Sequence, residues 1–272
     1  MGTPEKPTVV ISGMSGRFPG CDSVEELKEK LYSGENMVTA GGCRWGSGLW
    51  GEEPHIGKLN SLSHFDAEFF NLPPAIADRM DPQARIMTEV VCEAIIDAGV
   101  NPLTLRGSRT GVFVGLCFCD SEFYWFSGLH LFNKTGALHS FRSLLANRIS
   151  YIFDFKGPSI MLDTACSSSI YALEKATSSF YDGTCDAAVI VGCNLLLNPL
   201  TSSMLQLINA TSTRGCCRSF DEADFYSLAT GFKPFLRSSS CFSPPLCLLV
   251  VADRARSVEI KMSCSIYHHQ QA

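Results

Sequence analysis

The chain is organised around Ser159-Ile160-Met161-Leu162-Asp163-Thr164-Ala165-Cys166-Ser167-Ser168-Ser169. A short apolar run ends at Asp163, and small residues surround a single cysteine. The residues that follow place apolar side chains on one face of a helix: Ile170, Leu173, Ala176 and Phe180. The pattern predicts a strand, a sharp turn and a helix, with the Cys166 thiol at the turn.

This position suits a nucleophile. Backbone N–H groups at a helix N-terminus favour the thiolate form of a cysteine, and they can also donate to an oxyanion when a thioester carbonyl is attacked. The same logic applies to the serine nucleophile at a strand-to-helix turn. The alternative interpretation is a buried cysteine with a structural role, which is common for this residue type.

Apolar segments elsewhere predict further strands over residues 8–12, 111–116 and 187–192. The clearest helix begins with Asp81 as its cap and Pro82 at its first position, and it ends at Gly99. A second helix begins at the capping box formed by Ser23 and Glu26. We expect residues 119–141 to be irregular and residues 141–148 to be helical. Apolar strands separated by helices predict an α/β fold with a mostly parallel sheet covered by helices.

Composition narrows the function classes. The 272 residues are 46% hydrophobic and 18% charged, with a net charge of −5 and no basic cluster, so we expect no nucleic-acid partner. The thirteen cysteines are an odd number scattered through apolar segments, and no signal peptide is visible, which favours a reduced, cytoplasmic location. Cys117 and Cys119 lack the spacing of a zinc site, so we expect no metal. The apolar run 246–252 is too short to span a membrane.

The heptapeptide from Asp163 to Ser169 resembles the active-site signature of β-ketoacyl synthases in type I fatty acid and polyketide synthases. The likeness extends over roughly residues 7–224 and is closest to the ketoacyl synthase domain of animal type I fatty acid synthase. The segments that carry it are Gly13-Met14-Ser15-Gly16-Arg17, Arg44-Trp45, Gly48-Leu49-Trp50-Gly51, Met80-Asp81-Pro82-Gln83, Asn147-Arg148 and Asp154-Phe155-Lys156-Gly157-Pro158-Ser159.

This resemblance implies a thiolase-like fold of two similar halves, of which residues 1–224 are the N-terminal half. It implies that Cys166 accepts an acyl group from the phosphopantetheine arm of an acyl carrier protein, with no cofactor bound in the domain itself. Decarboxylation of a malonyl carrier protein then supplies the enolate that attacks the bound thioester. Family members are homodimers.

Two features depart from the family pattern. Condensation needs two histidines from the motifs H-G-T-G-T and K-S-N-x-G-H, and the sequence contains neither. After Cys166 the chain has only His268 and His269, which are adjacent and receive no catalytic role. Residues 225–272 match nothing in the family pattern and are expected to form an unrelated, irregular tail, with a short strand over residues 246–252. Without a second half, we expect Ile170, Leu173 and Phe180 to face water or the tail, and the isolated chain to associate.

Three functions therefore compete. The first is a β-ketoacyl synthase that transfers acyl groups through Cys166, in fatty acid or in polyketide synthesis. The second is a non-catalytic, truncated synthase fragment or splice product that acts through association. The third is an α/β binding module in which Cys166 is structural.

Overall fold

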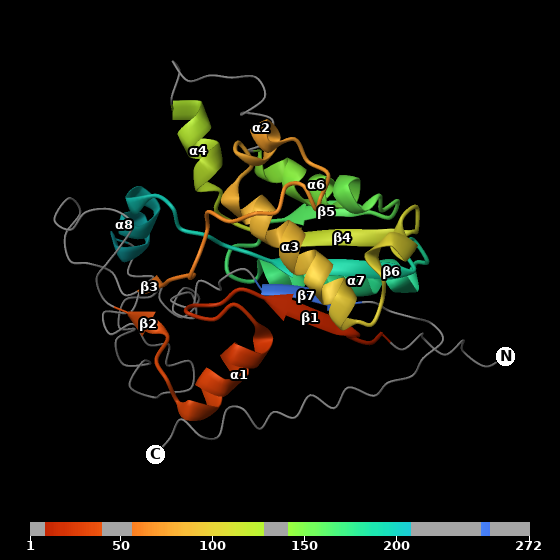
Figure 1. The fold of residues 1–272 in the computed structure, drawn as a ribbon, viewed down its shortest axis with the longest axis horizontal. Coiled ribbons are helices and arrows are strands. Elements are labelled where there is room, and N and C mark those ends of the chain that lie inside the picture. The colour runs from red at the N-terminus through yellow and green to blue at the C-terminus, as the bar shows by residue number, and fades with distance from the viewer. Residues whose placement is uncertain (1–8, 40–55, 128–140, 208–245, 251–272) are drawn as a thin grey trace, which may run out of the picture.

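The structure is a computed structural model that describes residues 9–39, 56–127, 141–207 and 246–250. Its main feature is a five-stranded sheet in the order β1-β7-β6-β4-β5 (Figure 1). The strands are β1 (Gly13–Gly16), β4 (Thr110–Gly115), β5 (Ser159–Leu162), β6 (Ala187–Gly192) and β7 (Leu246–Val250). Strand β4 is parallel to β5 and β6, while β7 is antiparallel to both of its neighbours, β6 and β1. Four strands therefore run in one direction, which confirms the mostly parallel sheet.

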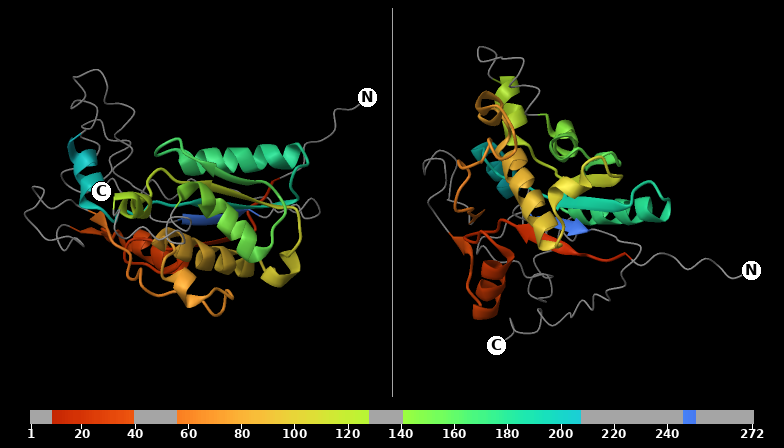
Figure 2. Two further views of the ribbon diagram at one scale, coloured as in Figure 1. Left: turned by 90° about the horizontal axis from the view of Figure 1, so that it is seen from above. Right: turned by 45° about the vertical axis from the view of Figure 1, so that its right-hand side comes forward.

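Helices lie on both faces of this sheet (Figure 2). Helices α3 (Pro82–Asp97) and α6 (Leu145–Phe153) cover one face, and α7 (Ser168–Tyr181) covers the other. Side chains of β4 alternate between two cores: Val112 and Val114 pack with residues of α3 and α6, whereas Phe113 packs with residues of α7. This alternation explains why β4 is apolar throughout, since a strand covered on both faces has no solvent side.

Helix α3 begins and ends as its sequence predicts. The Asp81 carboxylate accepts a hydrogen bond from the Gln83 N–H at 2.6 Å, Pro82 occupies the first position, and Gly99 follows with φ +73°. Helix α1 (Val24–Ser33) is also capped as expected, because the Ser23 hydroxyl accepts from the Glu26 N–H. The shorter elements are β2 (Val38–Thr39), β3 (Ile56–Gly57), α2 (Pro74–Ala77), η1 (Pro102–Leu105), α4 (Asp120–Ser127), η3 (Arg142–Leu144) and α8 (Pro199–Leu207).

The first strand was expected in the wrong place. Residues 9–12 form no strand, and β1 instead occupies the glycine-containing stretch from Gly13 to Gly16, where it pairs with β7. Strand β1 passes very close to α3: a Cβ on Gly13 would lie 2.3 Å from the Ala94 carbonyl oxygen. The glycine permits this close approach of the β1 backbone to α3.

The expectation for residues 119–141 was wrong in part, because Asp120–Ser127 form helix α4. Asp120 holds this helix to a distant segment: its carboxylate accepts from the Leu197 N–H at 2.6 Å and from the Thr201 hydroxyl at 2.8 Å. Residues 128–140 lie outside the described residues. The helix expected over residues 141–148 is present, but α6 begins at Leu145 and continues to Phe153.

The apolar face of α7 is only partly exposed. Ile170 is 66% exposed, as expected, and Leu173 is half-buried. Phe180, however, was wrongly expected to face water, since it is 4% exposed and packs with Phe113 and Ala176. The single sheet is therefore enough to bury the C-terminal end of α7.

Strand β7 lies within the predicted strand at residues 246–252 and is the described part of the segment 225–272. The division of the chain at residue 224 stays a prediction. Among the described helices, none combines the length and apolar character that crossing a bilayer requires.

Candidate active site

Cys166 lies in the turn between β5 and α7, as the sequence predicts. Strand β5 ends at Leu162 and α7 begins at Ser168, so five residues connect them. Ala165, directly before the cysteine, has φ +55°, a left-handed conformation that is uncommon for a residue with a Cβ. Strained backbone of this kind concentrates at functional turns. Cys166 is exposed, so the alternative interpretation of Cys166 as a buried cysteine with a structural role does not hold.

Hydroxyl groups hold this turn in shape. The buried Ser168 hydroxyl accepts from the Thr164 N–H at 2.9 Å and donates to the Ala165 carbonyl at 2.6 Å. The Ser167 hydroxyl donates to the Thr164 carbonyl at 2.8 Å. The Asp163 carboxylate accepts from the Ala165 N–H at 3.1 Å. Three side chains that flank the cysteine thus satisfy the backbone of the turn, which explains the run of small polar residues.

The N-terminus of α7 receives no cap from its own N-cap side chain. Ser167 occupies the N-cap position, but its hydroxyl bonds backward to Thr164 and makes no capping hydrogen bond to the helix. Within the first turn of α7, the Ser168 N–H donates to the Ala165 carbonyl and the Ile170 N–H donates to the Ser167 carbonyl, both at 3.1 Å. Cys166 lies just before this turn, so an oxyanion formed on a carbonyl attacked by its sulfur would lie beside the positive end of the helix dipole.

Strand β4 supports the turn from the neighbouring position in the sheet. A Cβ on Gly115, its last residue, would lie 2.5 Å from the Ser168 carbonyl carbon and 2.6 Å from the Ser169 nitrogen. The backbone of β4 therefore touches the first residues of α7 directly. Sequence analysis did not single out Gly115, although a glycine at the end of an apolar strand is a recognisable signal for such an approach.

Arg142 joins the ends of the two neighbouring strands. Its Nη1 donates to the Cys117 carbonyl and to the Asp163 carboxylate, both at 3.3 Å, and its Nε lies 3.8 Å from Glu122. Cys117 follows β4, and Asp163 follows β5. Arg142 was also missed by sequence analysis, because nothing in the sequence links a residue of η3 to two strand ends that far away along the chain.

Two further cysteines lie at this end of the sheet, and the pKa of each thiol is raised. Burial, followed by the charges of Asp163 and Cys166, raises the pKa of Cys117 to about 11. Burial and the Asp81 carboxylate raise the pKa of Cys119, whose thiol donates to Asp81 at 3.1 Å. Burial also raises the pKa of Asp81. Of these three thiols, only Cys166 is exposed.

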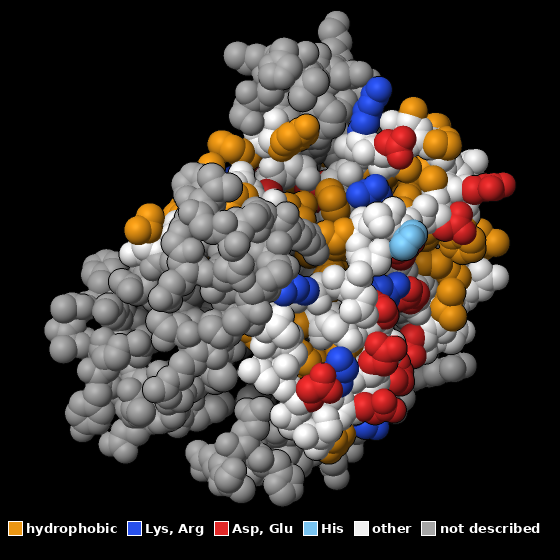
Figure 3. Space-filling view, turned by 60° about the vertical axis from the view of Figure 1, so that its left-hand side comes forward, with side chains coloured by type: hydrophobic (Ala, Val, Ile, Leu, Met, Phe, Trp, Pro, Cys, Tyr) orange, Lys and Arg blue, Asp and Glu red, His pale blue; other side chains and the backbone are white. Residues whose placement is uncertain are grey.

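Of the six histidines in the sequence, five lie outside the described residues, including His268 and His269. His64 is described, and its Nδ1 lies 2.8 Å from the Ser61 hydroxyl. The described part of the chain contains no group of three His, Cys, Asp or Glu side chains placed to hold a metal ion. Acidic and basic side chains are mixed on the face shown in Figure 3, in keeping with a net charge of −5.

Comparison with known proteins agrees with this geometry. The family model for the β-ketoacyl synthase N-terminal domain matches residues 6–234. Fatty acid synthase from the goose Anser anser anser is 44% identical over 213 residues, which are 78% of this chain and 60% of the goose protein. A phenolphthiocerol/phthiocerol polyketide synthase from Mycobacterium tuberculosis is 42% identical over 231 residues, which are 80% of this chain and 12% of that protein.

Solved ketosynthases share the fold. An oxazolomycin ketosynthase domain from Streptomyces albus has a TM-score of 0.72 at 36% identity, covering 79% of this chain and 39% of that one. The ketosynthase of module 6 of the Bacillus subtilis bacillaene synthase has a TM-score of 0.73 at 30% identity, covering 90% and 39%. The chain thus spans less than half of either ketosynthase, and its architecture is the N-terminal half of their thiolase-like fold. By both sequence and fold, the chain belongs to the β-ketoacyl synthase family.

Proposed function

We propose that this chain is an acyltransferase of the β-ketoacyl-[acyl-carrier-protein] synthase type, acting in fatty acid biosynthesis, in which Cys166 accepts an acyl chain as a thioester. The observation that carries this proposal is the exposed thiol at a strained strand-to-helix turn, directly before an uncapped helix N-terminus. The match of residues 6–234 to the family model also supports the proposal.

The transfer step follows from the arrangement of the turn. The Cys166 sulfur attacks the carbonyl carbon of an acyl thioester, and the carbonyl oxygen gains negative charge beside the N-terminus of α7. The tetrahedral adduct then expels the donor's sulfur, which takes up a proton and leaves as a free thiol. The acyl group remains on Cys166, so one thioester bond has been exchanged for another.

An acyl carrier protein is the proposed donor, because its phosphopantetheine arm can carry the chain to an exposed thiol. The choice of fatty acid over polyketide synthesis rests on the higher identity to the goose fatty acid synthase, 44% against 42%. Polyketide synthesis is the alternative substrate class. A homodimer in the cytoplasm is part of the same proposal. The tryptophan-bearing segments that favour fatty acid synthase lie outside the described residues.

We further propose that this chain stops at acyl transfer. Its sequence contains neither histidine motif that the family uses for decarboxylative condensation. The alternative is a non-catalytic fragment that acts only by associating with other proteins, and the exposed Ile170 and Tyr171 on α7 favour this second candidate.

The test is to incubate the full chain with an acyl-N-acetylcysteamine thioester and to measure the mass of its peptides. We expect one acyl group on the peptide 157–175, none in Cys166→Ala, and unchanged labelling in Cys117→Ala. Labelling that is equal in wild type and Cys166→Ala would overturn the proposal. Release of carbon dioxide from malonyl carrier protein, measured in parallel, should not exceed that of Cys166→Ala, and a clear excess would overturn the proposal that the chain stops at acyl transfer.

A further inference from the structure

Two cysteines follow the carboxyl ends of adjacent strands. Cys117 lies two residues after β4, and Cys166 lies four residues after β5. The last residues of these strands, Gly115 and Leu162, are direct partners in the parallel ladder. Neighbouring strands lie about 4.8 Å apart, so the two segments that carry the cysteines leave the sheet side by side. A disulfide requires a Cα separation of about 4.4–6.8 Å.

The backbone near both cysteines is held together by three independent contacts. The Leu116 N–H donates to the Leu162 carbonyl at 3.1 Å, which extends the pairing beyond β4. The Arg142 guanidinium joins the Cys117 carbonyl to Asp163. Gly115 touches the backbone of Ser168, two residues after Cys166. The two segments therefore stay together rather than diverging into separate loops.

The two thiols differ in exposure, and one acts on the other. The charge of Cys166 is one of the causes that raise the pKa of Cys117, after burial and the charge of Asp163. The Cys166 sulfur therefore lies within the range of a Coulomb interaction with Cys117. Cys166 is exposed to solvent, whereas Cys117 is half-buried and stays protonated. An oxidant in solution therefore reaches Cys166 first, and Cys117 does not compete with it.

We propose that Cys117 is a resolving cysteine that forms a disulfide with Cys166 after Cys166 has been oxidised by hydrogen peroxide. In the first step the Cys166 sulfur attacks one peroxide oxygen, the O–O bond breaks, and water leaves, which yields a sulfenic acid. In the second step the Cys117 sulfur attacks the Cys166 sulfur, the S–O bond breaks, and a second water leaves. Two thiols lose two electrons in total, and one peroxide molecule is reduced to two water molecules.

The disulfide would inactivate Cys166 reversibly and protect it from further oxidation. A sulfenic acid without a nearby thiol proceeds to sulfinic acid, which cellular thiols do not reduce, whereas a disulfide is restored by a dithiol. The proposal depends on the positions of the two sulfur atoms and not on whether Cys166 accepts acyl groups. Its failure is therefore separate from a failure of the proposed function.

Cys119 is the matched control, because it lies two residues after Cys117. Its thiol donates to the Asp81 carboxylate at the N-terminus of α3, so it faces a different helix. A disulfide that formed merely by proximity along the chain would use Cys117 and Cys119 alike. One that depends on the ends of β4 and β5 uses Cys117 alone.

The experiment treats the full chain with hydrogen peroxide, blocks the remaining thiols, and analyses tryptic peptides without reduction. Cys166 lies alone in peptide 157–175, and Cys117 shares peptide 110–134 with Cys119. We expect these two peptides to be linked in wild type and in Cys119→Ser, and not in Cys117→Ser or Cys117→Ala. We also expect several-fold more sulfinic acid on Cys166 in the Cys117 variants.

Dithiothreitol should restore a free Cys166 thiol fully in wild type but only in part in Cys117→Ser, because it does not reduce sulfinic acid. A linkage that persists in Cys117→Ser and disappears in Cys119→Ser would overturn the proposal. So would equal sulfinic acid on Cys166 with and without Cys117. Thermal unfolding of each variant before oxidation shows whether it is folded, and the Cys117→Ala variant provides a second test if Cys117→Ser is not.

Discussion

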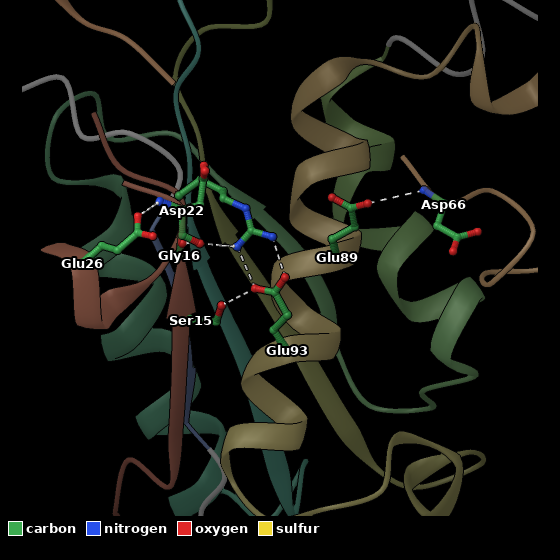
Figure 4. A network of polar contacts seen from close by, with 8 residues as sticks. Ser15, Gly16, Asp22, Glu26, Asp66, Glu89 and Glu93 are labelled. Atoms are coloured by element: carbon green, nitrogen blue, oxygen red, sulfur yellow. Dashed lines mark hydrogen bonds and ion pairs between the residues drawn. The ribbon is translucent and has the colours of Figure 1, made fainter. Parts of the chain in front are cut away.

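The guanidinium of Arg17 holds both carboxylate oxygens of Glu93, with Nη1 2.7 Å from Oε2 and Nη2 2.5 Å from Oε1 (Figure 4). Arg17 directly follows β1, and Glu93 lies on α3. The Ser15 hydroxyl also donates to Glu93, at 2.6 Å, and Arg17 donates to the Asp22 carbonyl at 3.0 Å. This network joins the start of the chain to the longest described helix through a bidentate pair, the strongest geometry for such ions.

Replacing Arg17 by Leu should lower the free energy of unfolding by about 1–2 kcal/mol, a value reduced for the partial exposure of both side chains. The loss arises because Glu93 keeps its charge without its partner. Urea unfolding measures it. The control is Arg109→Leu, which breaks an equally bidentate but exposed pair with Asp186. Equal losses in both variants would contradict the expectation.

The same pair predicts a pH dependence. Burial alone would raise the pKa of Glu93, but the hydrogen bonds from Arg17 and Ser15 outweigh it, so this pKa lies below the usual value of 4.5. A lowered pKa contributes stability that is full above about pH 4.5 and is lost as pH falls through the pKa of the folded state. In Arg17→Leu, the free energy of unfolding should therefore depend less on pH below pH 4.5. Above pH 4.5 it should be lower than in wild type by a constant amount. An unchanged slope at acid pH would speak against the pairing.

The Ser168→Ala variant should lose stability and acyl transfer together. It leaves the Thr164 N–H and the Ala165 carbonyl without their partner in two part-buried hydrogen bonds, at a cost of about 0.5–1.5 kcal/mol for each bond. Because the turn carries Cys166, its acylation rate should fall about tenfold or more. Ser167→Ala, at an exposed neighbour, should be milder in both measurements. Full acylation in Ser168→Ala would show that this hydroxyl does not shape the site.

A methyl group on Gly115 should displace α7. The Cβ of Gly115→Ala would lie 2.5 Å from backbone atoms of Ser168, and backbone cannot rotate away as a side chain can. We expect a loss of about 1–3 kcal/mol and slower acylation of Cys166. Gly34→Ala serves as a comparison, since it has open space but φ +70°, so it should cost stability without affecting acylation. Thermal unfolding and peptide mass spectrometry distinguish the two.

Proline within β7 should detach β1. The Met14 N–H donates to the Asp97 carboxylate at 2.8 Å and therefore points away from its partner Leu248, so the ladder bonds between β1 and β7 fall on neighbouring pairs such as Ser15 and Cys247. Cys247→Pro removes one of these donors and costs about 1–3 kcal/mol. Hydrogen exchange at residues 13–16 should become fast. Leu246→Pro, at the first residue of the strand, should be tolerated better. If residues 13–16 stayed protected in Cys247→Pro, β7 would not be their partner.

Exposed apolar side chains on α7 should drive self-association. Ile170 and Tyr171 are 66% and 51% exposed and adjacent. Ile170→Lys should reduce oligomers in light scattering while changing stability by less than about 0.5 kcal/mol. Lys175→Ala, on an exposed part of the same helix, should leave the oligomers unchanged. A wild-type chain that is strictly monomeric would refute this.

The sequence allowed prediction of those parts of the fold whose signals are local. The caps at Ser23 and Asp81, the strands β4 and β6, and the turn at Cys166 depend on neighbours along the chain, and these predictions are confirmed. The position of β1 was missed, because pairing with β7 and close contact with α3 select Gly13–Gly16 over the more apolar residues before it. Helix α4 was missed since its aromatic residues show no clear periodicity.

The candidate site divides in the same way. Cys166 and the serines around it were found because they are contiguous. Arg142, Gly115 and Cys117 were not placed there, because each reaches the turn through the order of strands in the sheet. Phe180 was wrongly expected to face water for a similar reason. Its partner Phe113 lies on β4, far away along the chain, so the contact depends on the packing of α7 against the sheet.

Strand β7 sets a limit on when the sheet can form during synthesis. It is the last described strand to leave the ribosome, yet it lies in the sheet between β6 and β1, and β1 is the first strand to leave the ribosome. Strands β4, β5 and β6 can assemble as soon as residue 192 has emerged, but β1 has no partner among the described strands until residue 250 has emerged. Between these two moments of synthesis, the side of β6 that later pairs with β7 is an unpaired sheet edge. This edge is the part of the nascent chain that most needs protection by a chaperone.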